Sequence, residues 1–387
     1  CGFCGTAEPE EKARLLAGPV VPVASPVKVD YWKVMPSEVP LSAELRDAFV
    51  AESESVLIEP DDSYTIEVGN QKLPWLEVQR TLQFQFPEQD NHFHHFFQDS
   101  ETYGGETEIG WVLISHTVHR GDTLLLIRDL YANKLYREPG ELSVEQFIAK
   151  IKFPIRFASL KPVQADYQSI VSLDDIMIVR NYKFGVLYAA DGQEEESAWL
   201  DNNEGSEAYE KFLDLLGERI ELRGWEDYKG GLDVESGTTG EHSVFQKFNG
   251  KRIMFHVGTL LPFDTKSDQQ IARKRHIGND IVVIIFKEAQ AKLKTITRSQ
   301  FNHIYIVVQE DTENEGHYIV EVARRDGVDL FVPAIPFPSS IPAASLQKFI
   351  LYKALNGEWA AYRSPQFHSR LSRARQMQLQ SFIESKK

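Results

Sequence analysis

The sequence predicts two domains of different class, an α+β domain over residues 63–175 and an α/β domain over residues 176–387. Strand-like runs dominate the first segment, which is typical of α+β domains built on antiparallel strands. The second segment alternates continuous apolar runs with helical patterns, which is typical of a sheet covered on both faces. Residues 1–60 are rich in Pro, Ala, Val and Glu, and we expect a weakly ordered lead-in there.

The elements of the first domain follow from local hydrophobic patterns. Strands are predicted at 63–69, 81–86, 109–118 and 123–130. The segment 143–151 places Val144, Phe147, Ile148 and Ile151 at helical spacing, so a helix is predicted there.

The second domain repeats strand and helix patterns along its length. Strands are predicted at 176–190, 243–248, 252–258, 280–286, 303–310 and 317–324. Helices are predicted at 206–220, 268–277 and 344–355. The C-terminal segment is predicted to form an amphipathic helix, because Phe367, Leu371, Ala374 and Phe382 recur near helical spacing.

Composition narrows the class of protein. The 387-residue chain has 57 acidic and 42 basic residues and a net charge of -15, which argues against nucleic acid or an anionic membrane as its main partner. Its longest apolar runs are strand-sized, so we expect no transmembrane segment. The two cysteines, Cys1 and Cys4, lack the context of a redox or zinc site, which indicates a cytoplasmic protein without disulfides. The chain begins on Cys rather than Met, so we expect a fragment.

The segment 268–280, DQQIARKRHIGND, concentrates basic residues from Arg273 to His276. A motif S-x-x-Q that starts at Ser267 predicts a capping box, and Gly278 lies where a helix commonly ends. Cations in a last helical turn complement the helix dipole, and Asn279 follows glycine as turn residues often do. Taken alone, these residues favour a structural role.

Other motifs give weaker indications. The segment 92–97, HFHHFF, has three histidines but no carboxylates or cysteines to complete a metal shell, so we expect a packed edge or an interface with exposed Phe93, Phe96 and Phe97. The glycine-rich segment 229–243 lacks a Walker motif, so we do not expect the chain to bind GTP or ATP by itself.

Several segments, in order, resemble Rap GTPase-activating proteins. They are YKFGVLYA (182–189), NEGSEAYEKFLDLLG (203–217), KGGLDVESGTTGEHSVF (229–245), KRIMFHVGTLLPF (251–263), QQIARKRHIGNDIVVIIF (269–286) and FHSRLSRAR (367–375). The resemblance is strong over about 180–375, weaker over about 75–175, and does not cover 1–60. It implies a dimerisation domain over 63–175 that forms a homodimer. It also implies a catalytic domain over 176–387 that resembles a G domain without a nucleotide-binding loop.

The resemblance further implies a mechanism. The family accelerates GTP hydrolysis by Rap-type small GTPases through an asparagine inserted in trans, and Asn279 matches that position. An asparagine amide carries both an acceptor and a donor, so it can orient the attacking water. His276 would shape the helix or touch the GTPase, while Arg273, Lys274 and Arg275 would face its acidic nucleotide-binding surface. Arg373 on the C-terminal helix is an auxiliary candidate.

This function requires no cofactor of the chain itself, because GTP and Mg²⁺ belong to the partner GTPase. The protein would then supply a catalytic residue without being an enzyme in the strict sense. The alternative is a catalytically weak GTPase-binding or dimeric scaffold module, against which the intact Asn279 argues. Ral- or Rheb-type partners are conceivable from related families. We expect a cytoplasmic protein that its partner recruits to membranes.

Overall fold

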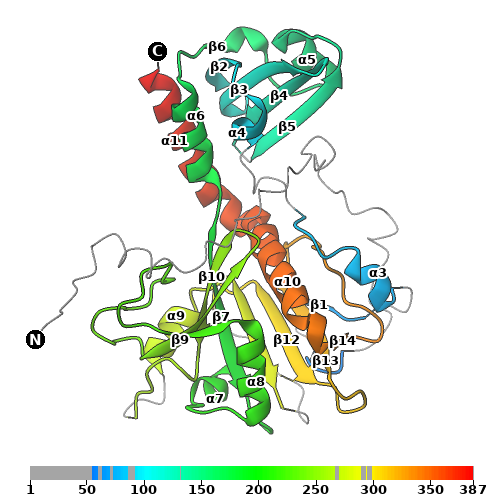
Figure 1. Ribbon diagram of the computed structural model, residues 1–387, viewed down its shortest axis with the longest axis vertical. Helices are drawn as coiled ribbons and strands as arrows, with labels where there is room; N and C mark the ends of the chain where they lie inside the picture. The colour runs from blue at the N-terminus through cyan, green and yellow to red at the C-terminus, as the bar shows by residue number, and fades with distance from the viewer. Residues whose placement is uncertain are drawn as a thin grey trace, which may run out of the picture. The chain divides into compact units, whose positions relative to one another are not determined.

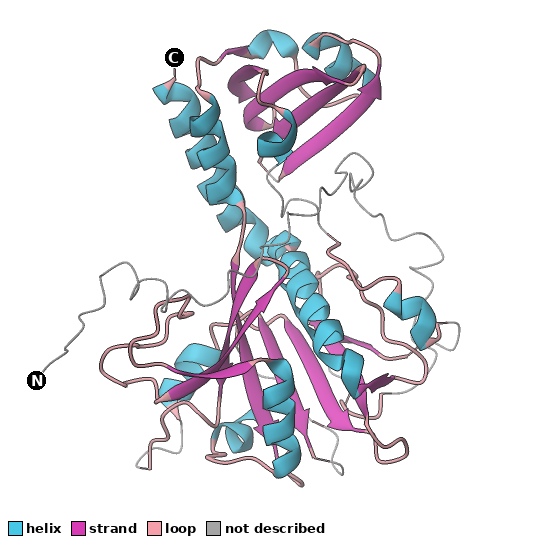
Figure 2. Ribbon diagram, viewed as in Figure 1, coloured by secondary structure: helices cyan, strands magenta, loops and turns pink. Residues whose placement is uncertain are grey.

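A computed structural model describes residues 55–59, 63–69, 73–85, 92–130, 132–265, 270–288, 293 and 299–386. The lead-in up to residue 54, with Cys1 and Cys4, lies outside these residues, as does Ser267. The described chain contains two sheets with helices packed on them, so its fold is mixed α and β (Figure 2).

The larger sheet has nine strands in the order β1-β13-β12-β11-β7-β10-β9-β8, with β14 paired to β13 (Figure 1). Its central strands pair in parallel. They are β7 (Asn181–Ala189), β10 (Lys251–Val257), β11 (Val282–Lys287) and β12 (Ile304–Glu310). Antiparallel strands extend the two edges. They are β8 (Glu218–Glu221), β9 (His242–Phe248), β13 (His317–Arg325), β14 (Ser340–Pro342) and β1 (Tyr64–Glu67).

Helices cover both faces of this sheet, as the sequence predicts. Side chains alternate along β11, so Val282 and Ile284 enter one core while Val283 and Ile285 enter the other. The first core includes residues of α3 (Trp75–Gln79), α8 (Glu207–Leu216) and α10 (Ala343–Arg363). The second includes residues of α7 (Glu196–Leu200) and α9 (Ile271–Ile277).

The smaller sheet has five antiparallel strands in the order β5-β4-β3-β2-β6. They are β2 (Glu101–Thr107), β3 (Gly110–His119), β4 (Asp122–Arg128), β5 (Asn133–Pro139) and β6 (Lys161–Pro162). Helix α5 (Val144–Lys150) packs on one face and begins with a capping box between Ser143 and Gln146. Helices α6 (Tyr167–Met177) and α11 (Pro365–Ser385) pack on the other face. Two short helices, α4 (His92–Phe96) and a 3-10 turn (Phe157–Ser159), complete this part.

The structure divides the chain differently from the predicted boundaries. Strand β1 pairs with β13 of the larger sheet rather than opening the smaller one. Its Glu67 forms a buried ion pair with Lys353 of α10 at 2.7 Å. Residues 81–85 form no strand, because their polar groups bond to α10 instead, as when the Gln85 backbone N–H donates to Asn356. Conversely, the C-terminal helix α11 packs on the smaller sheet. Whether the smaller part is a dimerisation domain stays a prediction.

Three further expectations need correction. The helix predicted over 206–220 ends at Leu216, because Gly217 adopts an extended backbone and strand β8 begins at Glu218. The HFHHFF segment forms helix α4 over His92–Phe96, and Phe93 and Phe97, which were expected to be exposed, are buried. Residues 55–59 are not weakly ordered, because backbone N–H groups of this segment donate to the buried Glu321 carboxylate.

Candidate functional site

Helix α9 begins later than the capping motif predicts. Its N-cap is Gln270, which adopts a left-handed conformation at φ 43° and makes no side-chain cap hydrogen bond to the helix. The Gln270 amide instead brackets Asp264, accepting from its backbone N–H and donating to its carbonyl oxygen, both at 3.0 Å. The predicted start at Ser267 is therefore wrong for the described helix.

Arg273 is buried, which corrects its predicted place on the partner-facing surface. Its guanidinium donates to the carbonyl oxygens of Leu200 at 2.7 Å, Asn202 at 2.6 Å and Leu261 at 3.0 Å. These bonds tie α9 to the chain that follows α7. Burial lowers the pKa of Arg273 from its ordinary value without discharging a guanidinium. Arg273 is therefore a structural residue that cannot dock a partner.

Asn279 lies at the exposed end of α9. Its backbone N–H donates to the His276 carbonyl oxygen at 3.1 Å, and its side-chain Nδ2 donates to the Arg275 carbonyl oxygen at 2.6 Å. No described donor reaches the side-chain oxygen of Asn279. Space is tight just before it, at Gly278, where a Cβ would lie 2.5 Å from the Lys274 carbonyl oxygen. Among the described residues, the Asn279 side-chain oxygen therefore has no donor.

A buried polar network holds the backbone beneath Asn279. Asp280 is fully buried; its carboxylate accepts from Lys183 Nζ at 2.9 Å and lies 2.8 Å from His256 Nδ1. Lys183 also donates to the Asn279 carbonyl oxygen at 3.0 Å. Asn302 Nδ2 donates to the Asp280 carbonyl oxygen at 2.5 Å. The peptide groups that flank Asn279 are therefore fixed by side chains from three strands or loops.

His256 links this network to the glycine-rich loop. Its Nε2 lies 3.0 Å from the Gly230 carbonyl oxygen, so Nε2 must donate. Its Nδ1 faces the Asp280 carboxylate, an acceptor when ionised. Strand β7 packs closely against α9 at Gly185, where a Cβ would lie 3.0 Å from Ile277 Cγ2.

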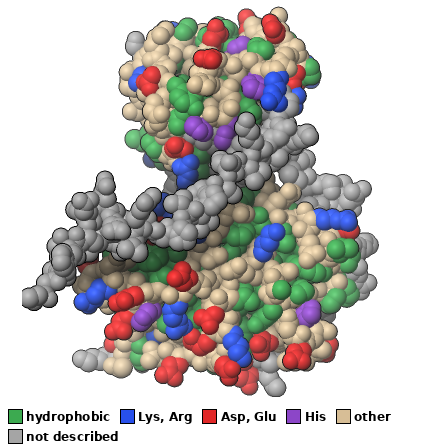
Figure 3. All heavy atoms as spheres, in the orientation of Figure 1, with side chains coloured by type: hydrophobic (Ala, Val, Ile, Leu, Met, Phe, Trp, Pro, Cys, Tyr) green, Lys and Arg blue, Asp and Glu red, His purple; other side chains and the backbone are tan. Residues whose placement is uncertain are grey.

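His276 is half-buried, and its ring packs edge-on against His256 at 5.2 Å. Desolvation, with a smaller contribution from the nearby His256, lowers the pKa of His276 to about 4. The ring is therefore neutral near pH 7. Within the basic run, Lys274 and Arg275 are the residues that present their charge to solvent. Over the face drawn in Figure 3, acidic and basic side chains are interspersed.

Arg373 lies apart from this constellation. It is an exposed residue of α11, and its neighbour Arg375 donates to the Asp129 carbonyl oxygen beside the smaller sheet at 2.6 Å. No described contact joins Arg373 to α9. The structure thus brings together Lys274, Arg275, His276 and Asn279 on one exposed surface. Arg273 is not part of that surface because it is buried, and Arg373 is not part of it because it lies on α11.

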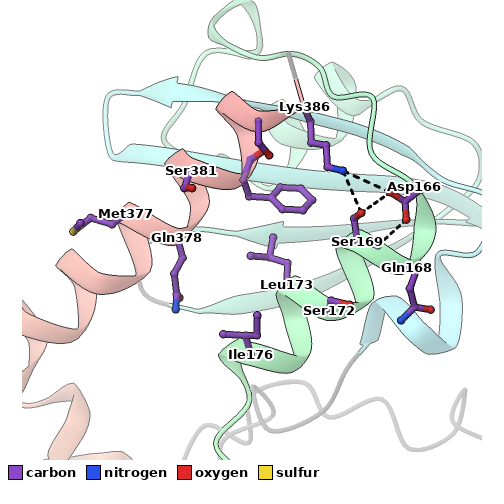
Figure 4. A pocket seen from close by; sticks show the side chains of 12 residues that line it. Asp166, Gln168, Ser169, Ser172, Leu173, Ile176, Met377, Gln378, Ser381 and Lys386 are labelled. Carbon is purple, nitrogen blue, oxygen red and sulfur yellow. Dashed lines mark hydrogen bonds and ion pairs between the residues drawn. The ribbon is translucent and has the colours of Figure 1, made fainter.

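A groove between α6 and α11 is a separate feature (Figure 4). Its apolar lining includes Leu173, Ile176 and Met377, and an ion pair between Lys386 and Asp166 lies at one end. None of the predicted site residues lines it. Within the described ranges, no three His, Cys, Asp or Glu side chains are grouped to hold a metal ion. No helix in those ranges is long and apolar enough to cross a membrane.

Sequence reasoning missed Lys183, His256, Asp280 and Asn302. Each lies in or beside an apolar run, and nothing in their spacing along the chain indicates that they meet. The one available signal was Asp280, an acidic residue placed directly before a continuous apolar strand, where burial requires a partner.

Comparisons with known proteins place this site in a family context. The Rap/ran-GAP family profile matches residues 199–376, which include α9 and His256 but not Lys183. The chain is 41% identical over 209 residues to GTPase-activating Rap/Ran-GAP domain-like protein 3 of Mus musculus, covering 53% of this chain and 20% of that protein. It is 40% identical over 219 residues to Signal-induced proliferation-associated protein 1 of Homo sapiens, covering 55% and 21%.

Two other similarities were found. A PH and Rap-GAP domain-containing protein of Dictyostelium discoideum is 40% identical over 232 residues, covering 59% of this chain and 20% of that protein. A solved structure of the TSC2 GAP domain is 30% identical, covers 47% of this chain and 96% of that chain, and has a TM-score of 0.41. The matches to the curated relatives thus span about a fifth of their length.

Proposed function

Because this chain belongs to the Rap/Ran-GAP family, we propose that it accelerates GTP hydrolysis by a Rap-type small GTPase, with Asn279 inserted in trans beside the nucleotide. The observation that carries the proposal is the exposed Asn279, whose side-chain oxygen has no described donor and whose backbone is fixed by a buried network.

The chemistry asked of Asn279 is positioning. Hydrolysis by a small GTPase depends on holding the attacking water in line and on stabilising the charge that develops on the phosphates. The Asn279 side-chain oxygen would accept a hydrogen bond from that water. Its Nδ2, released from the Arg275 carbonyl oxygen or shared with it, would donate toward the γ-phosphate.

The buried network supports this role by limiting how far Asn279 can move. A short side chain on a fixed turn loses little freedom when it enters the nucleotide site. Asp280, Lys183 and Asn302 hold the two peptide groups beside Asn279, and Ser299 Oγ donates to the Gly278 carbonyl oxygen at 2.6 Å. The network therefore positions the residue without touching the substrate.

The exposed cations would act at the docking step. Lys274 and Arg275 are exposed residues of α9, the helix that leads to Asn279. They would face the partner surface that holds the anionic nucleotide. Charges at the rim of an interface mainly change the association rate and its salt dependence. Neutral His276 would contribute shape and a hydrogen bond rather than charge.

The test is single-turnover GTP hydrolysis by a panel of purified Rap-, Ral- and Rheb-type GTPases, with and without this chain. Stimulation of the Rap-type protein, lost in Asn279→Ala, is the expected result. If the wild-type chain binds a GTPase without stimulating it, the alternative function as a GTPase-binding scaffold replaces this one.

Self-association of the part that contains the smaller sheet is a second proposal, and its support is the resemblance of that part to a dimerisation domain. Of the three aromatic side chains predicted to mediate it, Phe93 and Phe97 are buried and cannot form an interface, whereas Phe96 is half-buried. Analytical ultracentrifugation at micromolar concentration decides the matter: a dimer is expected, and a strict monomer would remove the proposal.

A further inference from the structure

Exposed apolar side chains gather around α9. Nine large apolar side chains are exposed in the described part of the chain, and three of them border this one seven-residue helix. They are Phe263, 37% exposed, Ile271, 63% exposed, and Phe301, 39% exposed. Apolar surface rimmed by polar residues is typical of a protein–protein interface.

Ile271 lies on the same helical face as Asn279. Ile271, Arg275 and Asn279 follow one another at intervals of four residues, so their side chains line one side of the helix. Gly278 keeps right-handed helical angles, φ -67° and ψ -10°, so the helical path continues to Asn279. The eight-residue separation corresponds to about 12 Å along the axis.

Phe263 is held at the same end of α9 as Ile271. The two hydrogen bonds between Gln270 and Asp264 bring the residues before and after the intervening loop together. Phe263 precedes Asp264 and Ile271 follows Gln270, so both extend from this clamp. The ring of Phe263 also packs under the Arg273 guanidinium, 5.1 Å from its centre.

Gln270 keeps the clamp in a conformation that non-glycine residues seldom adopt, the left-handed region. Such a conformation persists where the surroundings fix it, and Gln270 is 2% exposed. The backbone that carries Phe263 and Ile271 is therefore held in place by the bonds between Gln270 and Asp264.

Phe301 lies at the opposite end of α9. Its backbone N–H donates to Ser299 Oγ at 3.1 Å, and that hydroxyl donates to the Gly278 carbonyl oxygen at 2.6 Å. Apolar surface thus flanks the helix at both ends, with the cations Lys274 and Arg275 between.

We infer that Phe263, Ile271 and Phe301 form the apolar part of the surface that docks the GTPase, with Ile271 as its principal anchor. The inference rests on the proposed function, because the occupant is the GTPase that receives Asn279. That partner is chosen because one helix face carries the anchor, a cation suited to an anionic nucleotide site, and the inserted asparagine. The partner must then present an apolar patch about 12 Å from the point where Asn279 enters.

The experiment measures single-turnover hydrolysis by a Rap-type GTPase as a function of activator concentration. Ile271→Ala should raise the half-saturating concentration by about tenfold while leaving the maximal rate unchanged, because an anchor contributes binding that is equal in the ground and transition states. Phe263→Ala should act in the same direction. Leu76→Ala on α3 is the matched control, since Leu76 is 64% exposed and should change neither quantity.

The outcomes separate this inference from the proposed function. Loss of maximal rate in Asn279→Ala with an unchanged half-saturating concentration in Ile271→Ala and Phe263→Ala overturns the inference alone. If Ile271→Ala dissociates a dimer in sedimentation and leaves the half-saturating concentration unchanged, the surface serves a second copy and the inference is wrong. Normal melting curves of the variants are required, and they are expected because the altered side chains are exposed.

Discussion

At the scale of single residues, Asn279 is expected to affect catalysis and not stability. Asn279→Ala removes the acceptor and donor that would orient water, while the network around Asp280 keeps the turn in place. We expect the maximal stimulated rate to fall by a factor on the order of a hundred to a thousand, with the half-saturating concentration unchanged. Single-turnover kinetics at saturating activator measure this. Near-normal stimulation would move the catalytic assignment to another residue.

His276 gives a pH prediction at the same scale. Desolvation, followed by His256 and opposed by Asp280, lowers the pKa of His276 to about 4, below the 6.5 of a free imidazole; Arg275 and Lys183 lower it further. The unfolded chain therefore binds a proton at His276 more readily than the folded chain does. The contribution of neutral His276 to the free energy of unfolding is fully present above about pH 6.5 and is lost as the pH falls toward 4.

Urea unfolding at pH 7 and pH 5 checks this expectation. His276→Gln should lose less stability than the wild-type chain between the two pH values. Equal losses in the two proteins would show that His276 does not contribute to the acid sensitivity.

At the scale of the element, helix α9 buries Arg273 and exposes Arg275, although the sequence presents the two arginines as equivalent. Arg273→Ala leaves several buried carbonyl oxygens without a donor, and hydrogen bonds to a charged group are worth about 1.5–3 kcal/mol each. We expect a lower melting temperature. Arg275→Ala should instead keep the melting temperature and raise the half-saturating concentration for the GTPase, with a weaker salt dependence. Thermal unfolding and kinetics at two ionic strengths distinguish them, and the reverse pattern would contradict the structure.

At the scale of the whole molecule, a buried ion pair joins the smaller sheet to α6. Arg128 of β4 contacts both carboxylate oxygens of Asp174, at 2.5 and 2.7 Å, and Asn133 donates to the same carboxylate. Asp174→Ala leaves Arg128 buried and unpaired, which typically costs about 3–5 kcal/mol. The neighbouring Asp175→Ala removes an exposed pair with Arg180 and should be nearly neutral. Thermal unfolding compares the two variants; equal stability would show that the buried pair does not secure α6.

Local patterns in the sequence predict the elements, and its motifs indicate the family. The continuous apolar run of β11 predicts a strand buried on both faces, and the spacing in 143–151 predicts α5, because both depend on neighbours a few residues apart. The signature RKRHIGND likewise led to Asn279, which the structure leaves exposed at the end of α9. The catalytic role of Asn279 stays a prediction.

Which side of α9 faces the core and which strands share a sheet depend on how the elements pack in the tertiary structure. Arg273 is buried because carbonyl oxygens near residues 200 and 261 converge on it, and β1 joins the larger sheet because β13 offers it an edge. The network of Lys183, His256 and Asp280 likewise forms only when β7, β10 and the end of α9 are packed together. Periodicity reports contacts between near neighbours in the chain, whereas these contacts join residues from about 12 to 260 positions apart and depend on how the elements pack.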